Sequence, residues 1–295
     1  MGAVHTVVTY GRMIKFSHSV FALPFALSGA ALAASVFGAD LGQVGWIVVA
    51  MVGARSAAMG FNRLADRHLD AANPRTAQRE LPRGAVSPGA VALFVLLSAA
   101  ATVWAAYQLN PLCFYLSPLV LAVLLFYSLT KRFTWACHLV LGLCLGGAPV
   151  GAWLAIAGEF AWPPLLLGMA VLCWVAGFDI LYACQDYDFD RDTGLHSIPV
   201  RFGMAASLRL ARLLHLAAVG CMLAVGYMMG LQAVFYLGVA LIAGLLVYEH
   251  RLVRPDDLSK VNMAFATMNA VISVVFFVFT LADLLILGQA PLWRG

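Results

Sequence analysis

Charged side chains are scarce in this sequence. They make up 11% of the 295 residues, and apolar residues make up 63%, whereas a soluble domain has about 25% charged and about 45–50% apolar residues. This shortage excludes a soluble globular enzyme and a disordered chain. The 18 basic and 14 acidic residues give a net charge of +4, which is too small to indicate a nucleic-acid partner. We therefore predict an all-α polytopic membrane protein.

Cysteine pairs of the kind that bind metals or form disulfide frameworks are also missing. The six cysteines lie in or beside apolar runs, and none forms a C-x-x-C pair. Their positions are typical of small buried apolar side chains. The sequence therefore does not support a zinc site or a disulfide framework.

Nine apolar runs are long enough to cross a bilayer, which takes about 20 helical residues for about 30 Å. The first run follows Arg12 and Lys15 and continues past Ala31-Leu32-Ala33, a possible signal-peptidase site, so we expect an uncleaved first helix. The predicted spans are 19–38, 43–64, 89–108, 112–130, 136–157, 163–184, 206–228, 232–249 and 262–287.

Basic residues alternate between the connections of these spans. The connections near 39–42, 109–111, 158–162 and 229–231 contain no Lys or Arg, whereas the N-terminus and the other connections are basic. The positive-inside rule predicts a cytoplasmic N-terminus and an external C-terminus. The long polar segments 65–88, 185–205 and 249–261 then face the cytoplasm, where we expect the active site.

Asn62, Asp66 and Asp70 follow the second predicted span at intervals of four residues. On a continuing helix they form one stripe about 12 Å long. Like charges four residues apart destabilise a helix, so the stripe indicates a bound cation.

A second acidic segment follows the sixth predicted span. Asp186 and Asp190 again lie four residues apart, and Asp188 and Asp192 form another pair that points elsewhere. Mg²⁺ prefers oxygen ligands and often combines carboxylates with substrate phosphates. One such pair alone is typical of a solvated acidic loop. Two matched pairs in a chain with 14 acidic residues favour a metal–diphosphate site.

Basic residues accompany both acidic segments. Arginine binds phosphate through two parallel hydrogen bonds, and lysine supplies a point charge. The positive-inside rule alone would also place basic residues here, and we consider Arg79 and Lys131 the strongest candidates for diphosphate binding. The candidate phosphate-binding residues are Arg75, Arg79, Lys131 and Arg132.

Two charged residues stand out inside the predicted spans. Arg55 precedes Asn62 by one heptad, and Asp179 precedes Asp186 by the same interval, so each lies about 10 Å deeper on the same helical face. Arg55 could bind an acceptor carboxylate, and Asp179, near Tyr182, could bind an acceptor hydroxyl. A structural Arg55–Asp179 salt bridge is the alternative. We interpret His138 and His215 as ordinary helix residues.

The two acidic segments resemble the paired signatures of the UbiA superfamily of intramembrane prenyltransferases. Asn62-x3-Asp66-x3-Asp70 is similar to the first signature, and Tyr182-Ala183-x2-Asp186-x3-Asp190-x3-Gly194 is similar to the second. The segments 75–79, 127–132 and 197–203 also look like family sequence. Within the family, segment 14–24 most resembles the bacterial 4-hydroxybenzoate polyprenyltransferases, a branch that includes futalosine-pathway menaquinone enzymes.

This resemblance implies a single domain over 1–295, with nine helices bundled around a central cavity beneath a cytoplasmic cap. It implies that Mg²⁺ and diphosphate bind the catalytic residues Asp66, Asp70, Asp186 and Asp190 together with Asn62. The donor would be a polyprenyl diphosphate and the acceptor an aromatic acid, such as 4-hydroxybenzoate or 1,4-dihydroxy-6-naphthoate. The protein would work in the bacterial inner membrane, among lipids and without an obligate protein partner.

Two other functions are compatible with parts of this pattern. A prenyltransferase that acts on haem or a glycerol lipid would share the metal site and differ only in its acceptor pocket. A divalent-cation transporter would also contain intramembrane acids, but its ion site is expected near the midplane. Here four of the key acids lie at the cytoplasmic ends of the predicted spans and only Asp179 lies deep, which disfavours transport.

Overall fold

The computed structural model describes residues 3–15, 19, 21–253, 257–258, 261 and 267–287. The regular elements in these ranges are helices, and eight of them are long and apolar enough to cross a membrane. They are α3 (Leu41–Ala65), α5 (Pro88–Leu109), α6 (Pro111–Thr130), α7 (Cys137–Ala157), α8 (Trp162–Ala183), α11 (Met204–Met228), α12 (Ala233–Leu252) and α14 (Asn269–Leu287). The all-α membrane architecture is therefore confirmed.

The first predicted span corresponds to α2 (Leu23–Phe37), which is apolar but only 15 residues long. Pro24 occupies its first turn, a position where a missing backbone N–H costs nothing. The helix therefore begins later than the apolar run over 19–38. At the other end of the chain, α14 begins at Asn269, and residues 262–266 of the ninth predicted span lie outside the described residues.

Short helices precede the long ones or connect them. They are α1 (Ala3–Met13), α4 (Arg67–Ala72), the 3-10 turn Cys184–Asp186, α9 (Tyr187–Asp192) and α10 (Ile198–Phe202). Ser197 begins α10 by accepting a hydrogen bond from the Val200 N–H, a common helix N-cap. These segments carry both acidic motifs.

The chain divides into two compact units. The first comprises Met1–Ser19 and Gly45–Leu129, and the second comprises Val20–Val44 and Thr130–Gly295. In the first unit, α1, α3, α5 and α6 share an apolar core that includes Met13, Val91 and Leu121.

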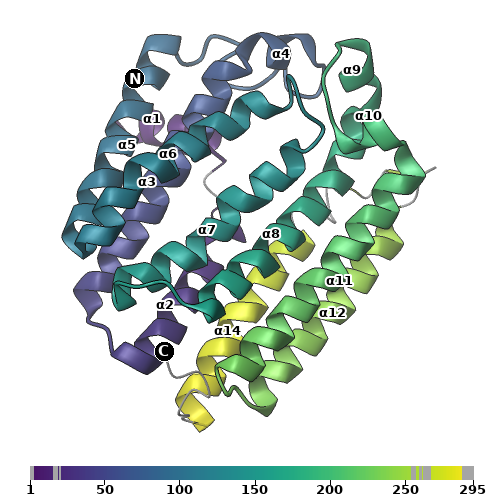
Figure 1. Cartoon of the computed structure of the whole chain (residues 1–295). Helices are drawn as coiled ribbons and strands as arrows, with labels where there is room; N and C mark the ends of the chain where they lie inside the picture. Colours follow the sequence, from purple (N-terminus) through teal and green to yellow (C-terminus); the bar gives the residue numbers. More distant parts are fainter. Residues whose placement is uncertain are drawn as a thin grey trace. The chain divides into compact units, whose positions relative to one another are not determined.

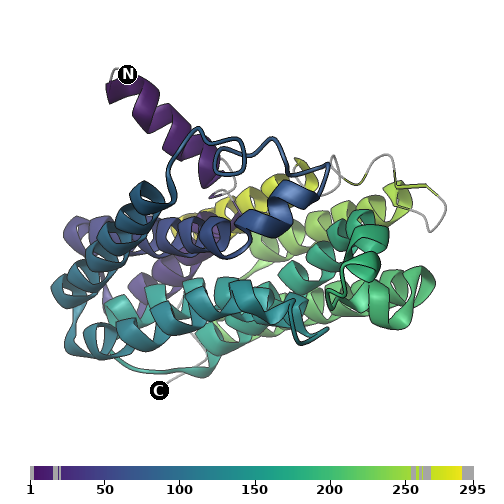
Figure 2. The same ribbon diagram turned by 90° about the horizontal axis from the view of Figure 1, so that it is seen from above.

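The second unit is built around α8, which packs against both α7 and α11. Helices α7 and α8 approach so closely that a Cβ at Gly146 would meet the carbonyl oxygen of Gly168. Small residues allow such contacts between membrane helices. In the same unit α11 and α12 lie side by side, as both views show (Figures 1 and 2). Trp153 and Trp174 are fully buried in its core.

Buried polar contacts also join the helices of the second unit. His215 on α11 lies 3.0 Å from His250 on α12, ring nitrogen to ring nitrogen. The Asn269 amide of α14 donates to the Glu249 carboxylate of α12 over 3.1 Å. His215, interpreted from the sequence as an ordinary helix residue, thus makes a polar contact between α11 and α12.

Candidate active site

The first acidic motif lies where α3 gives way to α4. Asp66 interrupts the α-helix with φ −96° and ψ 9°. The Asp66 N–H still donates to the Asn62 carbonyl over 2.9 Å, and the Asp70 N–H donates to the Asp66 carbonyl over 2.7 Å. The predicted continuous helix is therefore wrong at Asp66, but four-residue hydrogen bonding survives the interruption.

The side chains of this motif are already engaged with one another. The Asn62 side-chain amide nitrogen donates to Asp66 Oδ2 over 2.9 Å. The acceptor atom of the Asn62 side chain is its amide oxygen, Oδ1. Asp70 is buried, and Arg79 Nη1 lies 2.7 Å from its Oδ1. The loop between them is fixed by the Thr76 hydroxyl, which donates to the Asp70 carbonyl. Arg79, expected at a diphosphate, thus pairs here with an aspartate.

A cluster of basic residues surrounds this motif in the first unit. Burial and nearby positive charges lower the pKa of Lys15 to about 8, and the arginines responsible are Arg79, Arg63 and Arg75. Lys15 has a left-handed backbone, with φ 47°. Arg55 Nη2 donates to its carbonyl over 3.2 Å, and Arg63 Nε donates to the Met13 carbonyl over 3.0 Å. Sequence reasoning assigned Lys15 only to the membrane orientation and missed this cluster.

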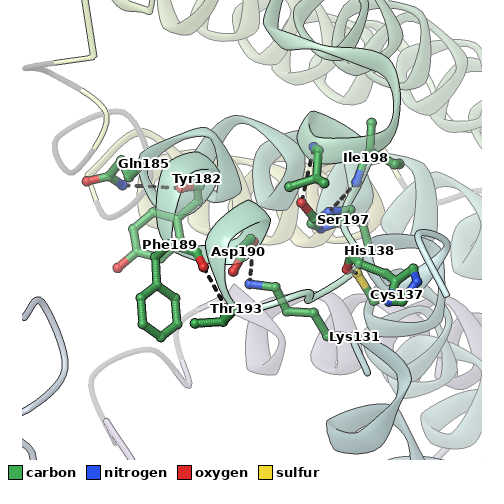
Figure 3. Close-up of polar contacts among 12 residues, drawn as sticks. Lys131, Cys137, His138, Tyr182, Gln185, Phe189, Asp190, Thr193, Ser197 and Ile198 are labelled. Carbon is green, nitrogen blue, oxygen red and sulfur yellow. Dashed lines mark hydrogen bonds and ion pairs between the residues drawn. The ribbon is translucent and has the colours of Figure 1, made fainter. Parts of the chain in front are cut away.

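The second motif lies where α8 ends. The 3-10 turn follows Ala183, and Asp186 adopts φ −98° and ψ 8° before α9 begins. Asp190 is fully buried, and Lys131 Nζ lies 2.8 Å from its Oδ2 (Figure 3). Burial by itself lowers the pKa of Lys131, but the Asp190 charge and hydrogen bond, with the Asp186 charge, outweigh it and raise the pKa above its ordinary value.

The two motifs share one local construction. Asp66 and Asp186 have nearly the same backbone angles and stand directly before a six-residue helix. Four residues later each motif has a buried aspartate, Asp70 or Asp190, paired with a basic side chain. The remaining acidic pair behaves as predicted, because Asp188 and Asp192 are exposed and contact Arg191.

The other predicted substrate-binding residues lie near these motifs within their own units. Tyr182 is partly buried at the end of α8, and its carbonyl accepts from the Gln185 amide over 3.4 Å. Arg132 is exposed beside Lys131, and the Arg75 N–H donates to the Asn73 side chain over 2.9 Å. In the second unit Asp179 Oδ2 lies 2.7 Å from His138 Nδ1. His138 is thus a polar partner that helix periodicity did not reveal.

Each motif supplies oxygen donors of the kind that Mg²⁺ uses. Among the described residues, no three His, Cys, Asp or Glu side chains gather closely enough to hold a metal by themselves. Mg²⁺ is usually held by one or two carboxylates together with waters and substrate phosphates. Two aspartates and an amide oxygen in the first motif, and two aspartates in the second, fit that arrangement better than an all-protein metal cage.

Apolar spans that end in carboxylate motifs paired with basic residues fit the class of intramembrane prenyl-transferring enzymes. The family model "UbiA prenyltransferase family" matches residues 22–280. The chain is 35% identical over 247 residues to a 4-hydroxybenzoate octaprenyltransferase of Aeromonas salmonicida, covering 83% of this chain and 85% of that protein. It is 34% identical over 229 residues to the enzyme of that name from Edwardsiella ictaluri, covering 77% and 79%.

Solved structures agree with this relationship. An apo UbiA homologue from Aeropyrum pernix K1 matches with a TM-score of 0.82 and 34% identity, covering 90% of this chain and 98% of that one. A UbiA homologue from Archaeoglobus fulgidus, bound to DMAPP and Mg²⁺, shares the fold with a TM-score of 0.71 at 20% identity, covering 94% and 99%. The chain belongs to the UbiA prenyltransferase family. It is a polyprenyltransferase and an integral membrane protein.

Proposed function

We propose that this enzyme transfers a polyprenyl group from a polyprenyl diphosphate to an aromatic acid that is a quinone precursor. The observation that carries the proposal is the shared construction of the two motifs, each with a buried aspartate held by a basic residue. The curated relatives support an acidic phenol as the acceptor. The two candidates are 4-hydroxybenzoate and 1,4-dihydroxy-6-naphthoate.

The metal in this proposal is Mg²⁺, bound with diphosphate by the two motifs. Its ligands would be Asn62, Asp66, Asp70, Asp186 and Asp190. When bound, Mg²⁺ neutralises negative charge on the departing diphosphate. The Mg²⁺ and DMAPP of the Archaeoglobus fulgidus homologue support this choice.

Basic side chains bind the diphosphate itself. When the donor binds, Arg79 leaves Asp70 and Lys131 leaves Asp190, and both basic side chains bind phosphate oxygens instead. These oxygens gain negative charge as the donor C–O bond breaks. Arg75 and Arg132 supply further positive charge. The ion pairs seen in the structure keep these buried carboxylates neutralised until the donor arrives.

Three residues inside the apolar spans or at their ends are assigned to the acceptor: Arg55 of the first unit and Asp179 and Tyr182 of the second. Arg55 Nε is buried and has no hydrogen-bond partner in the described part of the chain, which supports a role in binding the acceptor carboxylate. A ring carbon ortho to the acceptor hydroxyl attacks the allylic cation, a C–C bond forms, and loss of the ring proton restores aromaticity. The surrounding apolar helices exclude water, which would otherwise capture the cation.

We also propose that residues 1–295 form one catalytic domain whose N-terminus and motif-bearing segments face the cytoplasm. The support is the absence of Lys and Arg from the alternate connections, including 109–111 and 229–231. Single cysteines placed in segment 75–83 and segment 229–231 of a cysteine-free variant test this orientation. An impermeant thiol reagent applied to intact cells should label only the second.

The activity is tested with purified protein in detergent, Mg²⁺ and labelled octaprenyl diphosphate, with the two acids offered separately. We expect prenylation of one acid and a loss on the order of 100-fold or more in Asp66→Asn and Asp186→Asn. Asp188→Asn is the matched control, because Asp188 belongs to the same segment but is exposed, and it should keep wild-type activity.

Other outcomes would separate the alternatives. Donor cleavage without transfer to either acid would preserve the metal–diphosphate site and refute the acceptor, so haem and glycerol acceptors would be tested next. Absence of Mg²⁺-dependent turnover in folded protein would refute the proposed reaction.

A further inference from the structure

His138 and Asp179 form a pair that links two membrane helices of the second unit. His138 is the second residue of α7, and its side chain is only 3% exposed. Asp179 lies one turn before the end of α8 with 23% of its side chain exposed. The 2.7 Å separation of His138 Nδ1 and Asp179 Oδ2 is that of a charge-assisted hydrogen bond. The histidine is therefore enclosed, while the carboxylate remains accessible.

The other histidine nitrogen has a partner of its own. The backbone N–H of Ile198, the first residue of α10, points to His138 Nε2 over 3.4 Å (Figure 3). Because an N–H can only donate, Nε2 acts as the acceptor and the ring proton lies on Nδ1, directed at Asp179. The histidine is thus fixed in ring orientation and in tautomer.

The segment that precedes Ile198 is attached to the second acidic motif. The His196 N–H donates to the Lys131 carbonyl over 2.8 Å, and the Leu195 N–H donates to the Asp190 carbonyl over 2.8 Å. His138 thus stands between the backbone of the motif segment and the carboxylate of Asp179. Its position is fixed by the same segment that carries Asp190.

This arrangement leaves one oxygen of Asp179 uncommitted. Within the described part of the second unit, His138 is the hydrogen-bond partner of this carboxylate, through Oδ2. A carboxylate inside an apolar span is costly, and such residues usually serve a function. The accessible Oδ1 is suited to accept a hydrogen bond from a phenolic hydroxyl.

We propose that His138 is a positioning residue for the acceptor: through its Nδ1–H it holds Asp179 so that Oδ1 accepts the acceptor's hydroxyl hydrogen. This inference rests on the proposed prenyl transfer to a phenolic acid. His138 does not touch the acceptor, because its ring is enclosed. Partners that orient a ligand-binding group in this way contribute about 10- to 100-fold to affinity at metal sites, and we expect an effect of that size here.

The test measures KM separately for the acceptor acid and for octaprenyl diphosphate. His138→Leu should raise the acceptor KM by about 10-fold or more and leave the donor KM within about twofold of wild type. His138→Gln, which keeps an N–H donor, should recover part of this loss. His196→Gln is the matched control, because the His196 side chain is exposed, and it should behave like wild type.

A double variant shows whether the two residues act together. If His138 acts through Asp179, His138→Leu combined with Asp179→Asn should raise the acceptor KM no further than the more severe single variant. Multiplicative effects would overturn the inference. An unchanged acceptor KM in His138→Leu, or equal rises in both KM values with loss of thermal stability, would overturn it too.

A spectroscopic measurement separates this inference from the proposed function. In NMR spectra of protein labelled with ¹⁵N-histidine, the His138 signal is the one present in wild type and missing from His138→Gln. This signal should be that of a ring protonated at Nδ1, and the signal of a ring protonated at Nε2 would refute the assignment. Wild-type protein that transfers to no acid would refute the proposed function. Normal transfer in His138→Leu would refute only the positioning role.

Discussion

Replacement of Lys131 by methionine should destabilise the ligand-free protein, because it leaves the fully buried Asp190 carboxylate without its cation. At the observed 2.8 Å separation, the attraction is roughly 6 kcal/mol for an effective dielectric constant near 20. Solvent screens part of it, because 33% of the Lys131 side chain is exposed. Removal of one partner of a buried pair costs about 3–5 kcal/mol, so after this discount we expect about 2–4 kcal/mol.

The companion variant Asp190→Asn should cost less than Lys131→Met, because the partly exposed lysine can turn toward water. The double variant should recover most of the loss, since no unpaired buried charge remains. The free energy of unfolding is measured by SDS titration in mixed micelles, followed by circular dichroism. Arg191→Met is the control, because Arg191 pairs with the exposed Asp188, and it should cost much less than Lys131→Met.

Two results would refute this reasoning. In the first, Lys131→Met would cost no more than Arg191→Met, so the buried pair would contribute no more than a surface pair. In the second, Asp190→Asn would fail to restore stability in the Lys131→Met background. The loss would then come from the lysine's aliphatic packing and not from its charge.

Three further predictions concern stability. Burial and neighbouring arginines lower the pKa of Lys15 to about 8 in the folded protein, whereas its ordinary value is 10.5. The free energy of unfolding should therefore rise with pH between these two values, relative to that of Lys15→Met. Parallel pH profiles of the two proteins would contradict this. Asp283→Ala should cost about 2–3 kcal/mol in SDS titration, because it removes the acceptor of two backbone N–H groups at the start of α12, while Asp283→Asn should lose less. Gly146→Ala should lower the thermal midpoint because its Cβ meets the Gly168 carbonyl; Gly147→Ala, with open space around it, should raise or preserve that midpoint, and equal effects would refute the packing argument.

Hydropathy located the membrane helices closely because lipid dictates their composition. The predicted span 112–130 corresponds to α6 (Pro111–Thr130), and the span 206–228 corresponds to α11 (Met204–Met228). The first span differed more, because an apolar run need not be helical along its whole length. Phe21 and Ala22 are apolar without belonging to α2.

The motifs were recognisable because acidic residues are rare and their spacing is regular, but their surroundings were not. The interruptions at Asp66 and Asp186 carry no proline or glycine, so periodicity continued through them. The pairs Lys131–Asp190 and His138–Asp179 join residues that lie 59 and 41 positions apart in the sequence, with Lys131 in the turn after α6. One sequence without homologues contains no local signal for such contacts, and His138 therefore resembled an ordinary helix residue.

The two ion pairs at the acidic motifs also bear on how the chain is made. Asp70 in α4 and Asp190 in α9 lie beyond the ends of the long apolar helices, and both are buried. Asp70 and Asp190 each have a basic partner from the chain itself, so neither needs an ion from solution to be neutralised. The helices can therefore pack around both motifs before any divalent cation binds.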